Sequence, residues 1–231
     1  MLNPENIDDC LKPGAIINSD HPDVIEYAHD ALDGSESSDR EKAVKLYLRV
    51  RDDIRYNPYL PFYRPEHYLS SNVIKNRTGF CIPKAGLLCA VARVCGIPAR
   101  IGFASVKNHL STKQLLEYLG SDLIVYHGFT ELWIEGKWVK ATPAFNATLC
   151  LLHKVPPLEF DGLHDSIFHE FNSEQKKFME YVALHGVHHD VPVELIVSEW
   201  EKAYGRERVL KWISMSEDTG NTRDFTREDI V

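Results

Sequence analysis

The hydrophobic pattern in the first part of the chain predicts two helices. Apolar residues recur at helical spacing over 21–32, where Asp20 suits the N-cap position. They recur again from Ala43 to Ile54, behind Ser38 and Glu41, whose spacing is that of a capping box. The second of these helices presents one apolar face, which we expect to pack against a core.

A third helix is expected over 82–95, where almost every residue is small or apolar. Pro83 is favoured in a first helical turn, and Gly96 followed by Pro98 ends the segment. This pattern indicates a helix that is buried on all sides, with Cys81 at its N-terminus.

The middle of the chain changes to a pattern typical of strands. A strand is expected over 99–106 and a short helix over 111–119. The segments 123–134 and 137–145 are rich in β-branched and aromatic residues, and Glu135–Gly136 between them suits a two-residue turn. The sheet is therefore predicted to be largely antiparallel.

Beyond residue 146 the pattern predicts helices over 173–185, 190–204 and 207–215. From Ser216 onward the chain is polar and short of apolar residues, so we expect a flexible tail over 216–231.

Composition narrows the functional classes. Hydrophobic residues make up 44% of the 231, which is enough for a sizeable core, and the net charge of −8 comes without a basic block that could follow phosphates. We therefore expect no nucleic acid as partner. Neither a signal peptide nor a membrane-spanning stretch is recognisable, which favours a soluble cytoplasmic protein without a membrane partner.

The cysteines offer one candidate nucleophile. There are five, an odd number without CxxC spacing, which suits neither a disulfide framework nor a zinc finger. A thiol attacks acyl carbon as the thiolate, and a helix N-terminus lowers the pKa of a cysteine there. Cys81 has that position, whereas Cys89 and Cys95 lie within the same helix and are explained as small buried hydrophobes. Gly79 would let a substrate backbone approach the sulfur.

A nucleophilic cysteine needs a base, and His127 on the first strand of the hairpin is the candidate. If Glu135–Gly136 is the turn, Thr142 and His127 lie on one face of the ribbon. A residue that orients the imidazole could then be Thr142 or, slightly further along, Asn146. The histidines of the C-terminal half lack the spacing of a metal motif, so no metal or other cofactor is expected.

Two stretches resemble a known family. Arg77-Thr-Gly-Phe-Cys-Ile-Pro-Lys-Ala-Gly, which runs on to Gly96-Ile-Pro-Ala-Arg100, is similar to the core motif of the transglutaminase-like superfamily. His127-Gly-Phe-Thr-Glu-Leu-Trp, which runs on to Trp138-Val-Lys-Ala-Thr-Pro143, resembles the second motif of that family, a catalytic histidine followed by a tryptophan and an Asp-Pro.

The resemblance implies a papain-like α+β fold and acyl-transfer chemistry, with Cys81 as nucleophile and His127 as general base and acid. The chain departs from the family where its aspartate falls on Thr142, because a hydroxyl can accept the imidazole N–H bond but cannot stabilise imidazolium by charge. Three arrangements stay open: Thr142 orients the ring alone, Asn146 serves as the amide does in papain-like proteases, or the site is weakened.

The resemblance also suggests a division of the chain. We expect a helical extension over 1–38, a transglutaminase-like core over 39–146, a C-terminal helical extension packed on the core over 147–215, and the tail.

The function predicted is a cysteine-dependent enzyme that acts on amide or ester bonds of a peptide, a protein or a small amide. It would hydrolyse the bond or transfer the acyl group to an amine. The alternative is a weak or inactive module of the same fold that binds a peptide or protein partner.

Overall fold

The computed structural model describes residues 3, 5–108, 111–167, 179–217 and 223–228. Its α-helices are α1 (Pro22–Asp30), α2 (Asp39–Asp53), α3 (Ser70–Asn76), α4 (Cys81–Val94), α5 (Lys113–Leu119), α6 (Ala147–Leu152), α7 (Val193–Tyr204) and α8 (Arg206–Glu217). Its strands are β1 (Arg55–Tyr56), β2 (Thr78–Gly79), β3 (Ala99–Asn108), β4 (Leu123–Ile134), β5 (Lys137–Ala141) and β6 (Met179–His188). Three short 3-10 helices are η1 (Asp9–Leu11), η2 (Pro65–His67) and η3 (Phe225–Arg227).

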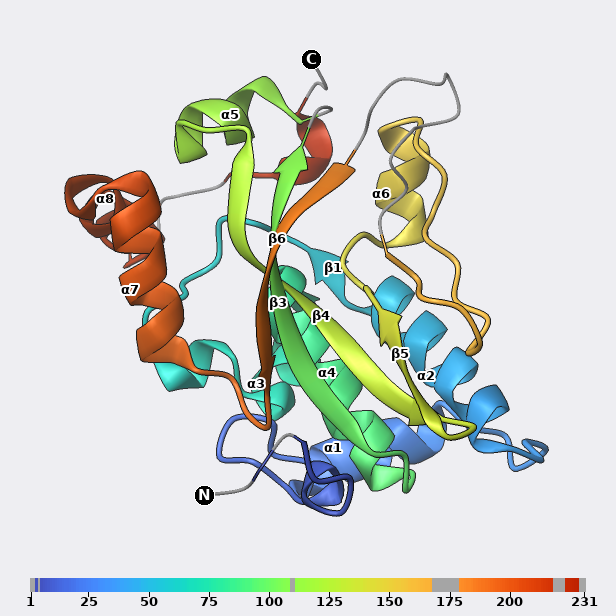
Figure 1. Ribbon diagram of the computed structural model, residues 1–231. Helices are drawn as coiled ribbons and strands as arrows, with labels where there is room; N and C mark the ends of the chain where they lie inside the picture. The colour runs from blue at the N-terminus through green and yellow to red at the C-terminus, as the bar shows by residue number, and fades with distance from the viewer. Residues whose placement is uncertain (1–2, 4, 109–110, 168–178, 218–222, 229–231) are drawn as a thin grey trace.

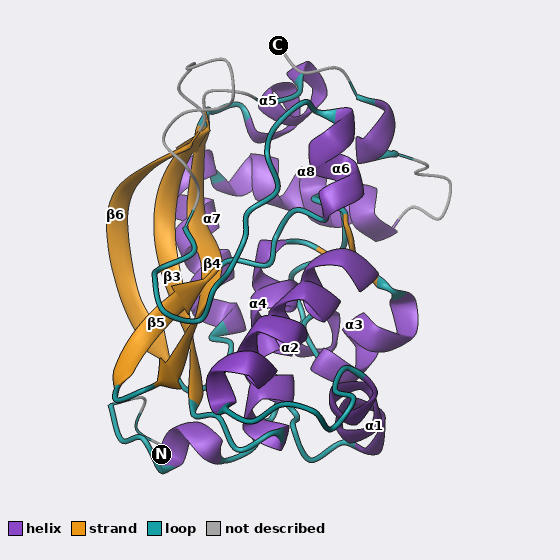
Figure 2. Cartoon of the chain, turned by 90° about the vertical axis from the view of Figure 1, so that its right-hand side faces the viewer, coloured by secondary structure: helices purple, strands orange, loops and turns teal. Residues whose placement is uncertain are grey.

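The centre of the fold is an antiparallel sheet in the order β5-β4-β3-β6 (Figure 1). A separate parallel pair, β1 and β2, lies next to the start of α4. Figure 2 shows α2 and α4 on one side of the four-stranded sheet. This arrangement confirms the predicted α+β class.

The helix that carries Cys81 is buried over all but its last residue. Every residue of α4 from Cys81 to Arg93 is buried, as the absence of a polar face in its sequence predicts. It packs on β4, where the Thr130 hydroxyl donates to the Ala85 carbonyl at 2.8 Å. A β-carbon added to Gly128 would lie 2.9 Å from the Ile82 α-carbon. The strand and the start of the helix are therefore in closest contact at Gly128.

A buried lysine joins the same helix to α2. Lys84 is fully buried, and its ammonium donates to the carbonyls of Arg51 at 2.9 Å and Ile54 at 2.5 Å, at the end of α2. Burial lowers the pKa of Lys84 to about 7. The two carbonyls compensate part of the cost of burying this side chain and hold the first turn of α4 against α2.

The predicted hairpin forms with the predicted register. Ile134 pairs with Lys137 and Thr130 with Ala141, and the turn residues Glu135 and Gly136 have φ of 52° and 82°, as a type I′ turn requires. The second strand ends at Ala141, four residues earlier than predicted. The expected common face of His127 and Thr142 required the two strands to pair beyond Ala141, and they do not.

The helix predicted over 173–185 is wrong for the residues that the structure describes. Residues 179–188 form β6, which pairs antiparallel with β3 from Ile101–His188 to Asn108–Met179. Residues 173–178 lie outside the described part. This segment is a strand because it pairs with β3, which lies some 80 residues away in sequence. Local periodicity cannot detect such a partner.

The expected flexible tail is also corrected where it is described. The helix α8 continues to Glu217, and the Phe225 ring is buried, with centroids 5.5 Å from the Tyr56 ring and 6.3 Å from the Tyr59 ring. The Tyr59 hydroxyl donates to the Glu228 carboxylate at 2.7 Å. Residues 223–228 thus pack on the core, whereas 218–222 and 229–231 lie outside the described residues.

The ends of two predicted helices also shift. The N-cap of α1 is His21, whose ring nitrogen accepts from the Asp23 N–H, and not Asp20. The N-cap of α5 is Thr112, whose hydroxyl accepts from the Leu115 N–H. The Ser38 cap of α2 is confirmed, because its hydroxyl accepts from the Glu41 N–H at 3.2 Å.

Across the described segments, no helix combines the length and the apolar character needed to cross a membrane.

The close contact at Gly128 predicts a large effect of one methyl group. In Gly128→Ala the new β-carbon meets backbone, which cannot move aside as a side chain would, so we expect a loss of about 1–3 kcal/mol in the free energy of unfolding. Urea unfolding measures it. Gly86→Ala, on α4, is the control, because its β-carbon would lie 3.6 Å from its nearest neighbour. Equal stability of the two variants would contradict the contact.

Candidate active site

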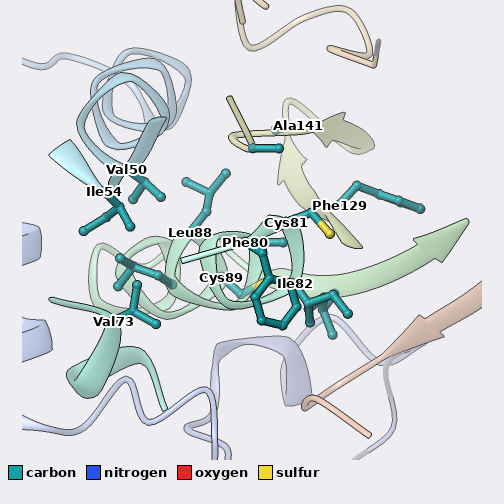
Figure 3. Close-up of a cluster of buried hydrophobic side chains, with 14 of the residues drawn as sticks. Val50, Ile54, Val73, Phe80, Cys81, Ile82, Leu88, Cys89, Phe129 and Ala141 are labelled. Carbon is teal, nitrogen blue, oxygen red and sulfur yellow. The ribbon is translucent and has the colours of Figure 1, made fainter. Parts of the chain in front are cut away.

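Cys81 is the first residue of α4, and its sulfur faces backbone N–H groups. Its neighbour Phe80 is the N-cap, with extended backbone and no side-chain capping bond. The backbone N–H groups of Gly128, Ile82 and Cys81 itself act on the sulfur so as to lower its pKa. Figure 3 shows the sulfur on the side of the helix where Phe129 of β4 lies. These donors would stabilise a negative charge at the sulfur.

Burial affects the pKa of Cys81 more strongly than these N–H groups do. Cys81 is only 6% exposed, and desolvation raises its pKa to about 11, although the three backbone N–H groups act in the opposite direction. The expectation of a lowered pKa, drawn from the helix N-terminus alone, is therefore wrong for this structure. At neutral pH the thiol is protonated.

His127 lies on β4, next to Gly128. It is 1% exposed, and desolvation lowers its pKa to about 3, so the imidazole is neutral at physiological pH. The preceding residue, Tyr126, has φ of 57°, in the left-handed region, where the β3–β4 register shifts. Such an irregularity re-aims the side chains that follow it.

The position of the sulfur relative to β4 follows from the strand geometry. Gly128 and Thr130 face α4, so alternation places His127 and Phe129 on the opposite face. A backbone N–H lies in the plane of the sheet, and β5 does not extend as far as Gly128. At Gly128, beside His127, the strand β4 is therefore not paired with β5.

The two residues predicted to orient His127 have other environments. Thr142 is buried, its carbonyl accepts from the Tyr47 hydroxyl at 3.2 Å, and its own hydroxyl makes no hydrogen bond to any described residue. The side-chain oxygen of Asn146 accepts from the Tyr56 N–H at 3.2 Å, and its side-chain NH₂ group donates to the Thr148 hydroxyl at 2.5 Å. Neither side chain hydrogen-bonds to the imidazole; Asn146 instead connects β1 to the start of α6.

A cavity of about 70 Å³ opens onto Cys81. Its walls come from the loop that follows β1, from α5, from the start of β4 and from α7 and α8. The aromatic side chains that contribute most of these walls include Tyr56, Phe62, Tyr118, Trp200, Tyr204 and Trp212.

The sequence indicated only part of this cavity. The aromatic residues of β1 and of the loop after it divide between two environments: Tyr56 and Phe62 line the cavity, whereas Tyr68 is fully buried. The contribution of Trp200 and Tyr204 was missed. Their spacing of four residues puts them on one face of a helix, which is the signal that could have indicated it.

The hydroxyl of Tyr56 is the polar atom of these walls that we single out, because Tyr56 lies on the strand next to the start of α4. Burial raises the pKa of Tyr56 well above its ordinary value, and the neighbouring Cys81 adds to this effect. Its backbone pairs with Gly79, two residues before Cys81. The hydroxyl makes no hydrogen bond within the described part of the chain, so it is available as a donor in the cavity that Cys81 lines.

The family follows from a direct match. The model of the transglutaminase-like superfamily matches residues 26–143, about half of the chain. The chain belongs to the transglutaminase-like superfamily. The match includes Cys81, His127 and Thr142, whereas Asn146, α7 and α8 lie beyond it.

Two solved structures are similar in part. A protein from Cytophaga hutchinsonii named a "putative cysteine protease" has a TM-score of 0.45 and 18% identity, over 80% of this chain and 54% of its own. A "putative protease" from Parabacteroides distasonis has a TM-score of 0.39 and 16% identity, over 58% of this chain and 25% of its own. This chain thus spans about half of the first protein and a quarter of the second. No curated protein matches the sequence.

The superfamily member described here has a neutral thiol and a neutral imidazole, which predicts the pH dependence of alkylation. Thiolate is the reactive form, so the rate at which iodoacetamide labels Cys81 should rise about tenfold per pH unit from pH 7 to 10. Peptide mapping by mass spectrometry separates Cys81 from the more exposed Cys95. A plateau between pH 6 and 8 would instead mean a thiolate–imidazolium pair and contradict the raised pKa.

Proposed function

We propose that this protein is a cysteine-dependent acyl-transfer enzyme that cleaves amide or ester bonds. The observation that carries the proposal is the position of the Cys81 sulfur, at a helix N-terminus, beside three backbone N–H groups and on the wall of a cavity. Of the five cysteines, Cys81 alone is among the residues that line this cavity. We infer a peptide, protein or small amide as substrate, and the cytoplasm as the place where its thiols stay reduced.

The neutral state of both side chains favours general-base catalysis over a preformed ion pair. In this mechanism the Cys81 sulfur attacks the substrate carbonyl while its proton passes to His127. The tetrahedral intermediate collapses, His127 returns the proton to the departing amine or alcohol, and a thioester remains on Cys81. Water then releases a carboxylic acid, or an amine acceptor gives a new amide, and the thiol is restored.

The negative charge that develops on the carbonyl oxygen needs donors. We propose the Cys81 N–H as one and the Tyr56 hydroxyl as the other, on the grounds that both border the cavity and the hydroxyl has no partner among the described residues. Tyr56 is itself held by Asn146, whose side chain accepts from its N–H. In this scheme Asn146 is a positioning residue for Tyr56.

A second candidate is a non-catalytic module that binds a peptide or protein partner. Two observations favour it: the thiol pKa of about 11, and a threonine at the place of the family's aspartate, where no carboxylate can stabilise imidazolium. The two candidates differ in whether a thioester forms on Cys81.

The test of the proposed function is a burst experiment with 4-nitrophenyl acetate. We expect a burst of about one nitrophenolate per chain, together with an acetyl group on Cys81 detected by mass spectrometry. His127→Ala should slow the burst about 10²-fold or more, since it removes the base. Cys95→Ala is the control and should keep the burst. Absence of a burst, or acetylation of Cys95 at the same rate, would favour the binding module.

The role of Tyr56 gives a separate prediction. Tyr56→Phe removes one oxyanion donor and should lower kcat about 10²-fold with little change in KM. Tyr27→Phe is the matched control, because it also removes a buried hydroxyl, whose partner is the Arg49 carbonyl on α2. Equal losses of kcat in the two variants would show a general effect of losing a hydroxyl and remove Tyr56 from the mechanism.

A further inference from the structure

We propose that the cavity beside Cys81 selects substrates whose acyl group is short, aliphatic and uncharged. This inference rests on the proposed function, because it assigns the cavity to the part of the substrate that is attached to the attacked carbonyl. The structure supports it through the charge, the hydrogen bonds, the size and the position of the cavity.

The walls exclude charge. Fourteen residues line the cavity, and none of them is Asp, Glu, Lys, Arg or His. A carboxylate or ammonium group in this space would lose its hydration without gaining an ionic partner, which costs several kcal/mol. An uncharged acyl group avoids that cost.

The walls also offer few hydrogen bonds. The indole N–H of Trp200 donates to the Val125 carbonyl at 2.8 Å, and that of Trp212 to the Tyr118 carbonyl at 2.9 Å. The Tyr204 hydroxyl accepts from the Val125 N–H at 2.7 Å and donates to the Leu123 carbonyl at 2.9 Å. These polar groups are therefore used within the protein, whereas the Tyr118 hydroxyl, like that of Tyr56, has no hydrogen bond to any described residue.

Because most polar atoms of the cavity wall are hydrogen-bonded within the protein, a ligand in the cavity would make mainly apolar contacts. Tyr56, whose hydroxyl has no such bond, lies on the strand next to Cys81. A substrate carbonyl would also lie next to Cys81. The inner part of the cavity is thus expected to recognise hydrocarbon and to reject hydroxyl and amide groups, which would lose their hydrogen bonds to water.

The size of the cavity limits the hydrocarbon. A cavity of about 150 Å³ is known to hold benzene, and the volume here is about 70 Å³, less than half of that. A benzene ring would require the surrounding aromatic side chains to move. An aliphatic group such as the isobutyl group fits the space better, and burying it gives favourable apolar contact.

The walls that set this size lie partly outside the family match. Trp200 and Tyr204 of α7 and Trp212 of α8 come after residue 143, where the match to the transglutaminase-like superfamily ends. The nucleophile and its helix are thus family features, whereas the limit on the acyl group comes in part from the C-terminal helices of this chain.

Binding can be tested without catalysis in the full chain carrying Cys81→Ala. Tryptophan fluorescence should report binding, because Trp200 and Trp212 lie in the cavity wall. We expect 3-methylbutanamide to bind at least about tenfold more tightly than succinamic acid, which is charged, and than phenylacetamide, which is larger. Equal binding of the three amides would overturn the inference.

Catalysis provides the second measurement, on the unchanged protein. The kcat/KM for 4-nitrophenyl 3-methylbutanoate should exceed that for the mono-4-nitrophenyl ester of succinic acid by about tenfold or more. Leu60→Phe, which places a larger group in the cavity wall, should lower the ratio of 3-methylbutanoate to acetate hydrolysis about tenfold. Leu32→Phe, at a half-buried leucine away from the cavity, is the control and should keep the ratio.

The two measurements separate the possible failures. Selective binding of 3-methylbutanamide without any ester hydrolysis would retain the cavity as a binding site and refute the proposed function. Hydrolysis without selectivity for the aliphatic acyl group, with equal binding of the three amides, would retain the function and refute the inference about the cavity.

Discussion

The site depends on the contact between the N-terminus of α4 and the backbone of β4. Glycine at position 128 allows the strand to reach the Ile82 α-carbon, and the N–H of the same glycine helps to lower the pKa of Cys81. Thr130 fixes the helix one turn further on through the Ala85 carbonyl. The position of the sulfur is therefore set by backbone packing, which leaves less freedom than contacts between flexible side chains.

This packing also determines the charge state of the site. A helix N-terminus and three N–H donors favour a thiolate, but a sulfur that is 6% exposed loses more from desolvation than it gains from them. The same burial keeps His127 neutral. The mechanism proposed above therefore transfers a proton during the attack and needs no separated charges at rest, which agrees with the lack of a carboxylate at position 142.

The C-terminal part of the chain contributes to both the sheet and the site. The strand β6 extends the sheet along β3, and α7 and α8 supply aromatic side chains to the cavity. Residues 223–228 return to the core, where Phe225 packs against Tyr56. The region expected to be a helical extension and a tail thus helps to shape the surroundings of Cys81, and the predicted limits of the segments 1–38, 39–146 and 147–215 stay a prediction.

The sequence by itself determined the local elements and the family. The capping pair before α2, the apolar run of α4 and the Glu135–Gly136 turn each depend on residues that are neighbours in the chain, so their patterns are readable without a structure. The motifs around Cys81 and His127 led to the superfamily for the same reason.

Only the tertiary structure decided how these elements meet. Residues 179–185 are a strand because β3 pairs with them, and Thr142 and Asn146 have partners that no spacing indicates. The pKa of Cys81 is raised because helix, strand and distant aromatic side chains together exclude water from it. Pairing, burial and desolvation depend on contacts between residues far apart in sequence, and these contacts exist only once the chain has folded.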